Sequence, residues 1–300
     1  NGPLDISISY QPGSKEVKID DNPLERLSDL LGYLNVVIFT PDDLQLVKGS
    51  PSVRRNFINN EISQVDPVYN HRLHKYNRVL RQRNNLLKEI GSKRKKEDEL
   101  LAWDIQLVEL GSRIIQKRFA VLHKLNPLAR LMQRKITFGQ EELALDYQVD
   151  LEVNYQTPLS EIKDKFLALL ERERTEELRR GITLYGPHRD DIKIESNEID
   201  MRKYGSQGQQ RTCVLALKLA ELEFMKSERG EYPLLLLDDV FSELDALRRE
   251  HLIKVIKDRV QTFITGTESN IIEFFPQNSK IFQVSEGRIM VEEKQRDQEG

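Results

Sequence analysis

Segment 233–245 of the chain, Pro233-Leu-Leu-Leu-Leu-Asp238-Asp239-Val-Phe-Ser242-Glu243-Leu244-Asp245, predicts a buried strand that ends in two carboxylates. Four consecutive leucines are typical of a strand that is covered on both faces, as in a parallel sheet. Ligands of open α/β sheets bind where such strands end. Adjacent carboxylates at that edge suit Mg²⁺, with one carboxylate holding the cation and the other orienting an attacking water. The alternative is a core strand that ends in a solvated acidic turn.

A second segment, Tyr204-Gly205-Ser206-Gln207-Gly208-Gln209-Gln210-Arg211, opens a long helical pattern. Its two glycines let the backbone approach a phosphate, and Ser206 can donate a hydroxyl hydrogen bond. The start of the helix adds unpaired N–H groups and the positive end of the helix dipole. Taken alone, an ordinary Gly/Ser loop that caps a helix is the better interpretation. One helix and a turn separate this segment from the acidic strand, and that joint arrangement is much rarer than either part.

Together, the two segments resemble an ABC-type ATPase of the SMC-like branch. Residues 206–209 are similar to the ABC signature motif, residues 234–239 to Walker B, and residues 242–245 to the D-loop. More narrowly, residues 34–268 resemble the RecF family of bacterial DNA recombination and repair ATPases. The strings that carry this resemblance include Val37-Ile-Phe-Thr-Pro41-Asp-Asp-Leu44, Lys48-Gly49-Ser-Pro51-Ser-Val-Arg54-Arg55-Asn-Phe57 and Gly186-Pro187-His188-Arg189-Asp190-Asp191.

The resemblance implies a cytoplasmic factor for recombinational repair of gaps and stalled forks, with ATP and Mg²⁺ as cofactors. It implies an ATP-dependent homodimer that binds single-stranded, double-stranded or junction DNA and works with RecR and RecO to help load RecA. Asp238 would hold Mg²⁺, Asp239 would position the water, and Ser206 would contact the γ-phosphate bound by the other protomer. The implied signature residues are Ser206, Gln207, Gly208 and Gln209, and the implied D-loop residues are Ser242, Glu243, Leu244 and Asp245.

The chain departs from the family pattern in three places. It contains no Gly-x-x-x-x-Gly-Lys-Ser/Thr string, whose amides and Lys hold the phosphates. We therefore expect a hydrolysis-deficient fragment without the Walker A region. Asp239 stands where most ABC ATPases have Glu, and Gly266-Thr267 stands where many relatives have a switch His. A non-hydrolytic DNA-binding scaffold and another ABC-type head, such as a transporter ATPase, are the alternatives.

Residues 51–134 predict a helical arm inserted into an α/β body. Ser50-Pro51 suits a helix start, and apolar residues recur every three or four positions on both sides of Gly91-Ser92. This predicts an antiparallel hairpin whose arms are about 25–30 Å long and which closes at Asn126-Pro127. The two seams consist of Leu73, Tyr76, Leu80, Arg83, Leu87 and Ile90, and of Leu100, Trp103, Leu107, Leu110, Ile114, Lys117 and Val121.

The first half of the arm is strongly basic. Residues 72–96 contain ten Lys or Arg against one acid, Glu89, in a chain whose formal net charge is -3. Such a stripe can neutralise phosphates without reading bases, whereas the alternative is a solvated coiled-coil face. The candidate DNA contacts are Arg54, Arg55, Arg81, Arg83, Lys93, Arg94, Lys95 and Lys96.

The rest of the chain alternates strands and helices, which predicts an α/β fold with a largely parallel sheet. The predicted domains are the remainder of an N-terminal ATP-binding lobe (1–50), the arm (51–134) and a second ATPase lobe (135–300). The predicted strands are 5–9, 16–20, 34–39, 143–147, 151–153, 182–185, 192–194, 234–237, 262–265, 281–284 and 288–291, and the predicted helices outside the arm are 160–180 and those after Gly208 and Asp245.

Composition excludes several classes of protein. Hydrophobic residues make up 38% of the chain and charged residues 32%, so the chain is not disordered throughout. No apolar run approaches the roughly 18–20 residues of a membrane span. The single cysteine, Cys213, excludes an internal disulfide. In segment 186–191, one His beside close carboxylates makes a poor metal cage, so we expect a structural or subunit-interface role there.

Overall fold

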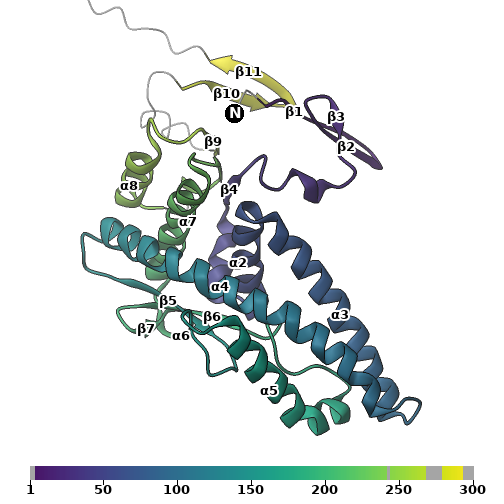
Figure 1. The fold of residues 1–300 in the computed structure, drawn as a ribbon. Helices are drawn as coiled ribbons and strands as arrows, with labels where there is room; N and C mark the ends of the chain where they lie inside the picture. The colour runs from purple at the N-terminus through teal and green to yellow at the C-terminus, as the bar shows by residue number, and fades with distance from the viewer. Residues whose placement is uncertain (1–3, 242–243, 268–278, 293–300) are drawn as a thin grey trace, which may run out of the picture.

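The leucine-rich strand lies at the centre of a parallel sheet in the computed structural model, which describes residues 4–241, 244–267 and 279–292 (Figure 1). This strand, β8 (Leu234–Asp238), pairs with β4 (Val36–Phe39) on one side and β9 (Thr262–Thr265) on the other. Leu235 and Leu237 are buried, as expected for a strand covered by helices. The predicted α/β fold is confirmed.

The predicted parallel sheet is confirmed for these three strands, whereas the other sheets of the described residues are antiparallel. These sheets consist mostly of hairpins, which connect only antiparallel strands, together with one pairing of strands 143–148 and 191–196 across an intervening helix. They are formed by β1 (Ile6–Gln11), β2 (Ser14–Ile19) and β3 (Asn22–Pro23); by β5 (Leu143–Gln148), β6 (Asp191–Ser196) and β7 (Ile199–Asp200); and by β10 (Ile281–Ser285) and β11 (Arg288–Glu292).

Two predicted strands, 151–153 and 182–185, are absent from the described residues. In the second, side chains of neighbouring helices occupy the backbone donors that a strand would need. The Thr183 amide donates to Asn84 Oδ1 at 2.7 Å, and the Leu184 amide donates to Glu177 Oε1 at 2.8 Å. An apolar pattern alone could not reveal these tertiary partners.

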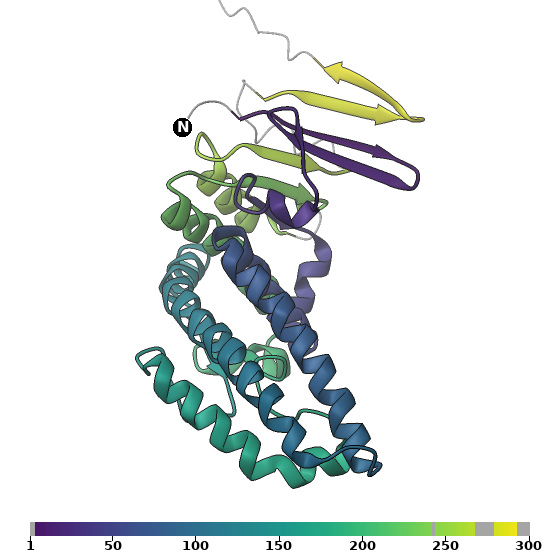
Figure 2. The ribbon, with the colours of Figure 1, turned by 45° about the vertical axis from the view of Figure 1, so that its right-hand side comes forward.

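The arm consists of α3 (Pro67–Gly91), α4 (Leu100–Ile136) and α5 (Leu159–Arg180), which lie side by side and extend away from the parallel sheet (Figures 1 and 2). A third helix therefore joins the predicted hairpin. With 25 and 37 residues, α3 and α4 are about 37 and 55 Å long, longer than expected. The remaining helices are η1 (Leu27–Leu30), η2 (Pro41–Leu44), α1 (Gln45–Lys48), α2 (Pro51–Val65), η3 (Glu97–Glu99), α6 (Met201–Tyr204), α7 (Gln207–Arg229) and α8 (Ala246–Ile256).

Helix α4 does not close at Asn126-Pro127, because Pro127 lies inside it and the helix continues to Ile136. An interior proline costs about 3 kcal/mol in an isolated helix. Here α4 packs against α3, α5, α7 and β5, and such packing supplies most helix stability in proteins. No helix of the described residues is both long and apolar enough to cross a bilayer.

Arg83 lies in the interior of the arm, fully buried, and is not available to DNA. Its guanidinium donates to Asp104 Oδ1 of α4 at 2.7 Å and to Glu177 Oε2 of α5 at 2.6 Å. A third bond, of 2.8 Å, reaches Thr183 Oγ1. Both carboxylates are also fully buried. The prediction that Arg83 contacts DNA is wrong, because this side chain joins the three helices of the arm.

Replacing Arg83 with Ala is expected to lower the free energy of unfolding by about 3–5 kcal/mol, because two buried carboxylates lose their counter-charge. The measurement is urea unfolding followed by circular dichroism. The matched control is Arg81→Ala, two residues away and exposed, which we expect to change stability by less than about 0.5 kcal/mol. Equal effects of the two substitutions would contradict this view of the arm.

Candidate nucleotide site and nucleic-acid surface

The carboxyl end of β8 places Asp238 and Asp239 beside the end of β9. Thr265, the last residue of β9, donates from its hydroxyl to Asp238 Oδ1 at 2.5 Å. The backbone amide of Asp239 donates to the Thr265 carbonyl and hydroxyl oxygens, each at 3.2 Å. Asp239 has a φ of 51°, in the left-handed region that Asp adopts more readily than most residues. Register with β9 therefore fixes the backbone that carries both acids.

The Asp238 and Asp239 side chains fit Mg²⁺ only if phosphates complete its coordination. The described residues contain no group of three or more His, Cys, Asp or Glu side chains able to hold a metal. Nucleotide sites commonly hold Mg²⁺ through one or two carboxylates, with waters and substrate phosphates as the other ligands. Asp238 is exposed at the sheet edge, which suits that shared coordination.

Ser206 is the N-cap of α7, and a reciprocal capping box fixes the signature segment. The Ser206 hydroxyl accepts from the Gln209 amide at 3.2 Å, and the Gln209 side-chain oxygen accepts from the Ser206 amide at 3.1 Å. The Gln209 side-chain nitrogen donates to Glu141 Oε1 at 3.2 Å. Ser206, Gln207 and Gly208 are exposed, so this end of α7 can approach a second molecule.

The predicted D-loop lies between β8 and α8. Ser242 and Glu243 lie outside the described residues. Leu244 is buried, and its carbonyl accepts from Arg249 Nε at 2.9 Å. Asp245 is the N-cap of α8, where its side chain accepts from the Arg248 amide at 2.9 Å. The described half of this loop is thus anchored to the start of α8.

Arg248 brings the start of α8 to the start of α7. Its Nε donates to Thr212 Oγ1 at 2.8 Å, and a terminal nitrogen lies 3.5 Å from the Gly208 carbonyl. The same guanidinium pairs with Asp245. The signature and D-loop segments, separate in sequence, therefore meet. No sequence pattern marks Arg248, because its partners come from α7.

Segment 186–191 is a partly buried junction organised by Arg118 of α4. Arg118 donates to the Pro187 carbonyl at 2.6 Å and to Asn59 Oδ1 of α2 at 3.0 Å. It also lies 3.7 Å from Asp190 Oδ2, which accepts from the Tyr147 hydroxyl. Burial raises the pKa of Asp190 to about 7. These contacts support a structural role for the segment.

The predicted α4 seam misses Arg118 because it places Lys117 inside. In the structure, Lys117 is partly exposed and pairs with Asp66 at 2.9 Å, whereas Arg118 is buried. A helix that contacts neighbours on several sides buries more positions than a two-helix seam. The sequence feature that could have indicated this burial is that Arg118 lies one helical turn after Ile114 and Ile115, which are buried.

His188 is held by hydrogen bonds at both ring nitrogens. Nε2 lies 3.2 Å from the Thr183 carbonyl, so it carries the proton, and Nδ1 accepts from the Tyr76 hydroxyl at 2.7 Å. Burial lowers the pKa of His188 to about 4. The ring is therefore neutral, and neither nitrogen points to a metal.

Because His188 has a lowered pKa when folded, its stabilising effect is complete above the unfolded pKa of about 6.5 and is lost as the pH falls toward 4. The expected loss between pH 7.5 and pH 5 is about 2 kcal/mol. The test compares urea unfolding of the protein and of His188→Gln at both pH values. The destabilisation caused by the substitution should be smaller at pH 5 by that amount. Equal destabilisation at both pH values would contradict the assignment.

Two further DNA candidates, Arg54 and Arg55, have partners within the protein. Arg54 is buried and binds both oxygens of Asp191, at 2.7 and 2.8 Å. The prediction that Arg54 contacts DNA is therefore wrong. Arg55 is half-buried and donates to the Asp190 carbonyl at 2.7 Å. Burial lowers the pKa of Arg55. Its hydrogen bond to segment 186–191 gives Arg55 a structural role within the protein.

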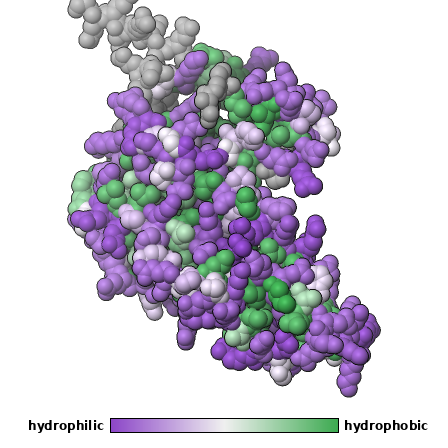
Figure 3. All heavy atoms as spheres, in the orientation of Figure 1, coloured by the Kyte–Doolittle hydropathy of each residue, from purple (hydrophilic) through white to green (hydrophobic). Residues whose placement is uncertain are grey.

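The other candidates lie on an exposed face of the arm that we call the basic arm surface. Of the predicted tip residues, Lys95 forms an ion pair with Glu99 at 3.1 Å and is therefore not counted in this surface. None of the ion pairs found among the described residues involves a residue of the basic arm surface. Hydrophilic residues cover the end of the arm on the face seen in Figure 3. The basic arm surface comprises Lys75, Arg78, Arg81 and Lys88 of α3 and Lys93, Arg94 and Lys96 of the turn.

Comparisons with known proteins were made by family, sequence and structure. No protein-family model matches the chain. The chain is 54% identical over 289 residues to the DNA replication and repair protein RecF of Halothermothrix orenii, covering 95% of this chain and 77% of that protein. It is 43% identical to RecF of Halalkalibacterium halodurans, covering 96% and 78%. A solved structure described as the recombination mediator protein RecF-ATP in the RecFOR pathway superposes with a TM-score of 0.85 at 36% identity, covering 95% and 75%.

Proposed function

The chain belongs to the RecF family of DNA replication and repair proteins, and from this premise we propose how its site works. We propose that it forms most of an ABC-type ATPase head that dimerises on ATP and binds DNA through the basic arm surface. The contact of Arg248 with Gly208 and Thr212 carries this proposal, since it joins the D-loop segment to the signature segment. This family membership also favours a repair ATPase over a transporter-type head.

We assign one task each to Asp238, Asp239 and Ser206. Asp238 holds a divalent cation, which neutralises charge on the transferred phosphoryl group. Asp239, on its fixed backbone, accepts a hydrogen bond from the attacking water. Ser206 donates its hydroxyl to the γ-phosphate of a nucleotide bound by a second copy. The Ser206 hydroxyl can do so while still accepting from the Gln209 amide, because a hydroxyl has one donor and two acceptor positions.

The 300 residues contain no P-loop string, and Walker B and signature residues do not replace the amides and Lys that hold the phosphates. We therefore assign hydrolysis to the protein expressed from its full coding sequence. We also propose that it works in the cytoplasm with RecO and RecR, as the RecFOR pathway of the solved RecF suggests. The phosphate backbone of DNA is the partner that the exposed arginines and lysines of the arm suit best.

In a protein that also contains the P-loop, replacing Ser206 with Arg is expected to abolish ATP-dependent dimerisation while leaving ATP binding by the monomer unchanged. The reason is that the new side chain fills the space where the nucleotide of the other copy should lie. Sedimentation with and without ATP, together with nucleotide titration of the monomer, measures both effects. Ser92→Arg, which adds the same charge at an exposed position of the arm, is the control. ATP-dependent dimers of the Ser206 variant, or loss of monomer binding, would refute the role in trans.

Replacing Lys75, Arg78 and Arg81 together with Ala should weaken binding to unrelated duplexes alike. The slope of log K against log salt should fall by up to about 2.7, or about 0.9 for each lost phosphate contact. Fluorescence anisotropy between about 50 and 300 mM salt measures this slope. The control removes three exposed basic residues outside the basic arm surface, Arg130, Lys135 and Lys257. If both triple variants change the slope equally, the basic arm surface is not the DNA-binding surface.

A further inference from the structure

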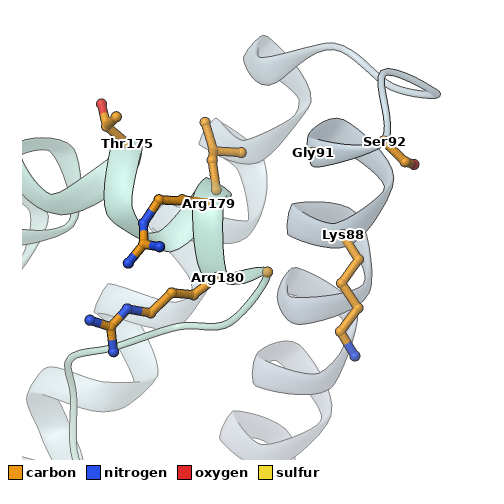
Figure 4. Close-up of a pocket in the computed structure, with 8 residues that line it drawn as sticks. Lys88, Gly91, Ser92, Thr175, Arg179 and Arg180 are labelled. Atoms are coloured by element: carbon orange, nitrogen blue, oxygen red, sulfur yellow. The ribbon is translucent and has the colours of Figure 1, made fainter.

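A hollow of about 610 Å³ lies between the end of α3 and the end of α5 (Figure 4). Gly181, which follows α5, allows this close approach. Its φ is +66°, and a Cβ there would lie 2.9 Å from Lys88 Cγ of α3. The hollow borders the basic arm surface, because Lys88 belongs to both. This hollow, which we call the groove, therefore extends the basic arm surface toward α5.

Basic side chains flank the hollow from opposite sides. In Figure 4, Lys88 extends from α3 in one direction, whereas Arg179 and Arg180 extend from α5 in the other. All three are exposed. Because their charged ends diverge, they could not converge on one small anion in the hollow. They could each meet a different phosphate of an extended polyanion that crosses both helices.

We propose that a nucleic-acid backbone crosses this groove from the basic arm surface onto the end of α5, with its phosphates bound by the basic residues on either side. Lys88 contacts the backbone on one side, and Arg179 and Arg180 contact it on the other. Arg suits this role because its planar guanidinium can bind a phosphate through two parallel hydrogen bonds. Contacts of this kind position nucleic acid without reading its sequence. The inference rests on the proposed DNA-binding function of the arm.

Glu176 competes with the phosphates for both arginines. It pairs with Arg179 at 2.6 Å and with Arg180 at 2.5 Å. Hydrogen bonds from Arg179 and then Arg180 lower the pKa of Glu176 to about 2, so the carboxylate is charged at neutral pH. Exposed ion pairs of this kind are weak, so a phosphate chain can displace the carboxylate. Glu176 therefore limits affinity without blocking the groove.

The experiment measures binding of the protein, expressed from its full coding sequence, to a duplex and to a single strand by fluorescence anisotropy over a salt series. Arg179→Ala with Arg180→Ala should weaken binding roughly 10-fold at low salt and lower the salt slope by up to about 1.8. Glu176→Gln should act in the opposite direction and tighten binding several-fold, because both guanidiniums are released. An opposite pair of effects is difficult to obtain from misfolding.

Matched controls lie on the same helix. Arg172→Ala with Lys165→Ala removes two cations that have acidic partners of their own, and Glu173→Gln removes the partner of Arg172. Both controls should bind DNA as the unchanged protein does. If Lys75, Arg78 and Arg81 matter but the Arg179/Arg180 and Glu176 variants behave like these controls, the groove is refuted and the arm surface stands. If none of these variants alters binding, both the groove and the proposed arm function fail.

Discussion

A buried guanidinium must have partners for its N–H donors, and this constraint determines how the arm is built. Arg cannot lose its charge, so burial is tolerated only where acceptors are fixed around it. The acceptors of the Arg83 guanidinium are Asp104 of α4, Glu177 of α5 and Thr183 of the following segment. Each acceptor comes from a different part of the chain, so the ion-pair network requires all three helices to be in register. The network thus specifies a three-helix arm where apolar seams would permit a simple hairpin.

Arg118 applies the same constraint where the arm meets the head. Its acceptors lie on α2, in segment 186–191 and on the Tyr147 side chain of β5. The junction therefore connects the helices that carry the basic arm surface to the antiparallel sheet and, through Arg54 and Asp191, to the start of α2.

The nucleotide edge depends on smaller, local interactions. Thr265 binds Asp238 across β8 and β9, the capping box fixes Ser206, and Arg248 joins α8 to α7. These bonds leave Asp238, Ser206, Gln207 and Gly208 exposed. Exposure is what the proposed site, shared between two copies, requires, because in that proposal each copy supplies groups to a nucleotide held by the other. The proposed groove beside Glu176 has a similar property, since weak exposed ion pairs are readily exchanged for a ligand.

The sequence by itself determined the strands and helices with strong apolar periods and the parallel pairing of the leucine-rich strand, and it predicted the signature and acidic segments. Those features depend on neighbouring residues or on short motifs, so they are visible locally. Only the tertiary structure decided which arginines are buried, why residues 182–185 are not a strand and why α4 passes through Pro127. A basic residue in a helical pattern has the same sequence signature whether it faces DNA or a buried carboxylate. The difference between Arg81 and Arg83 lies in Asp104 and Glu177, which only the folded chain brings to Arg83.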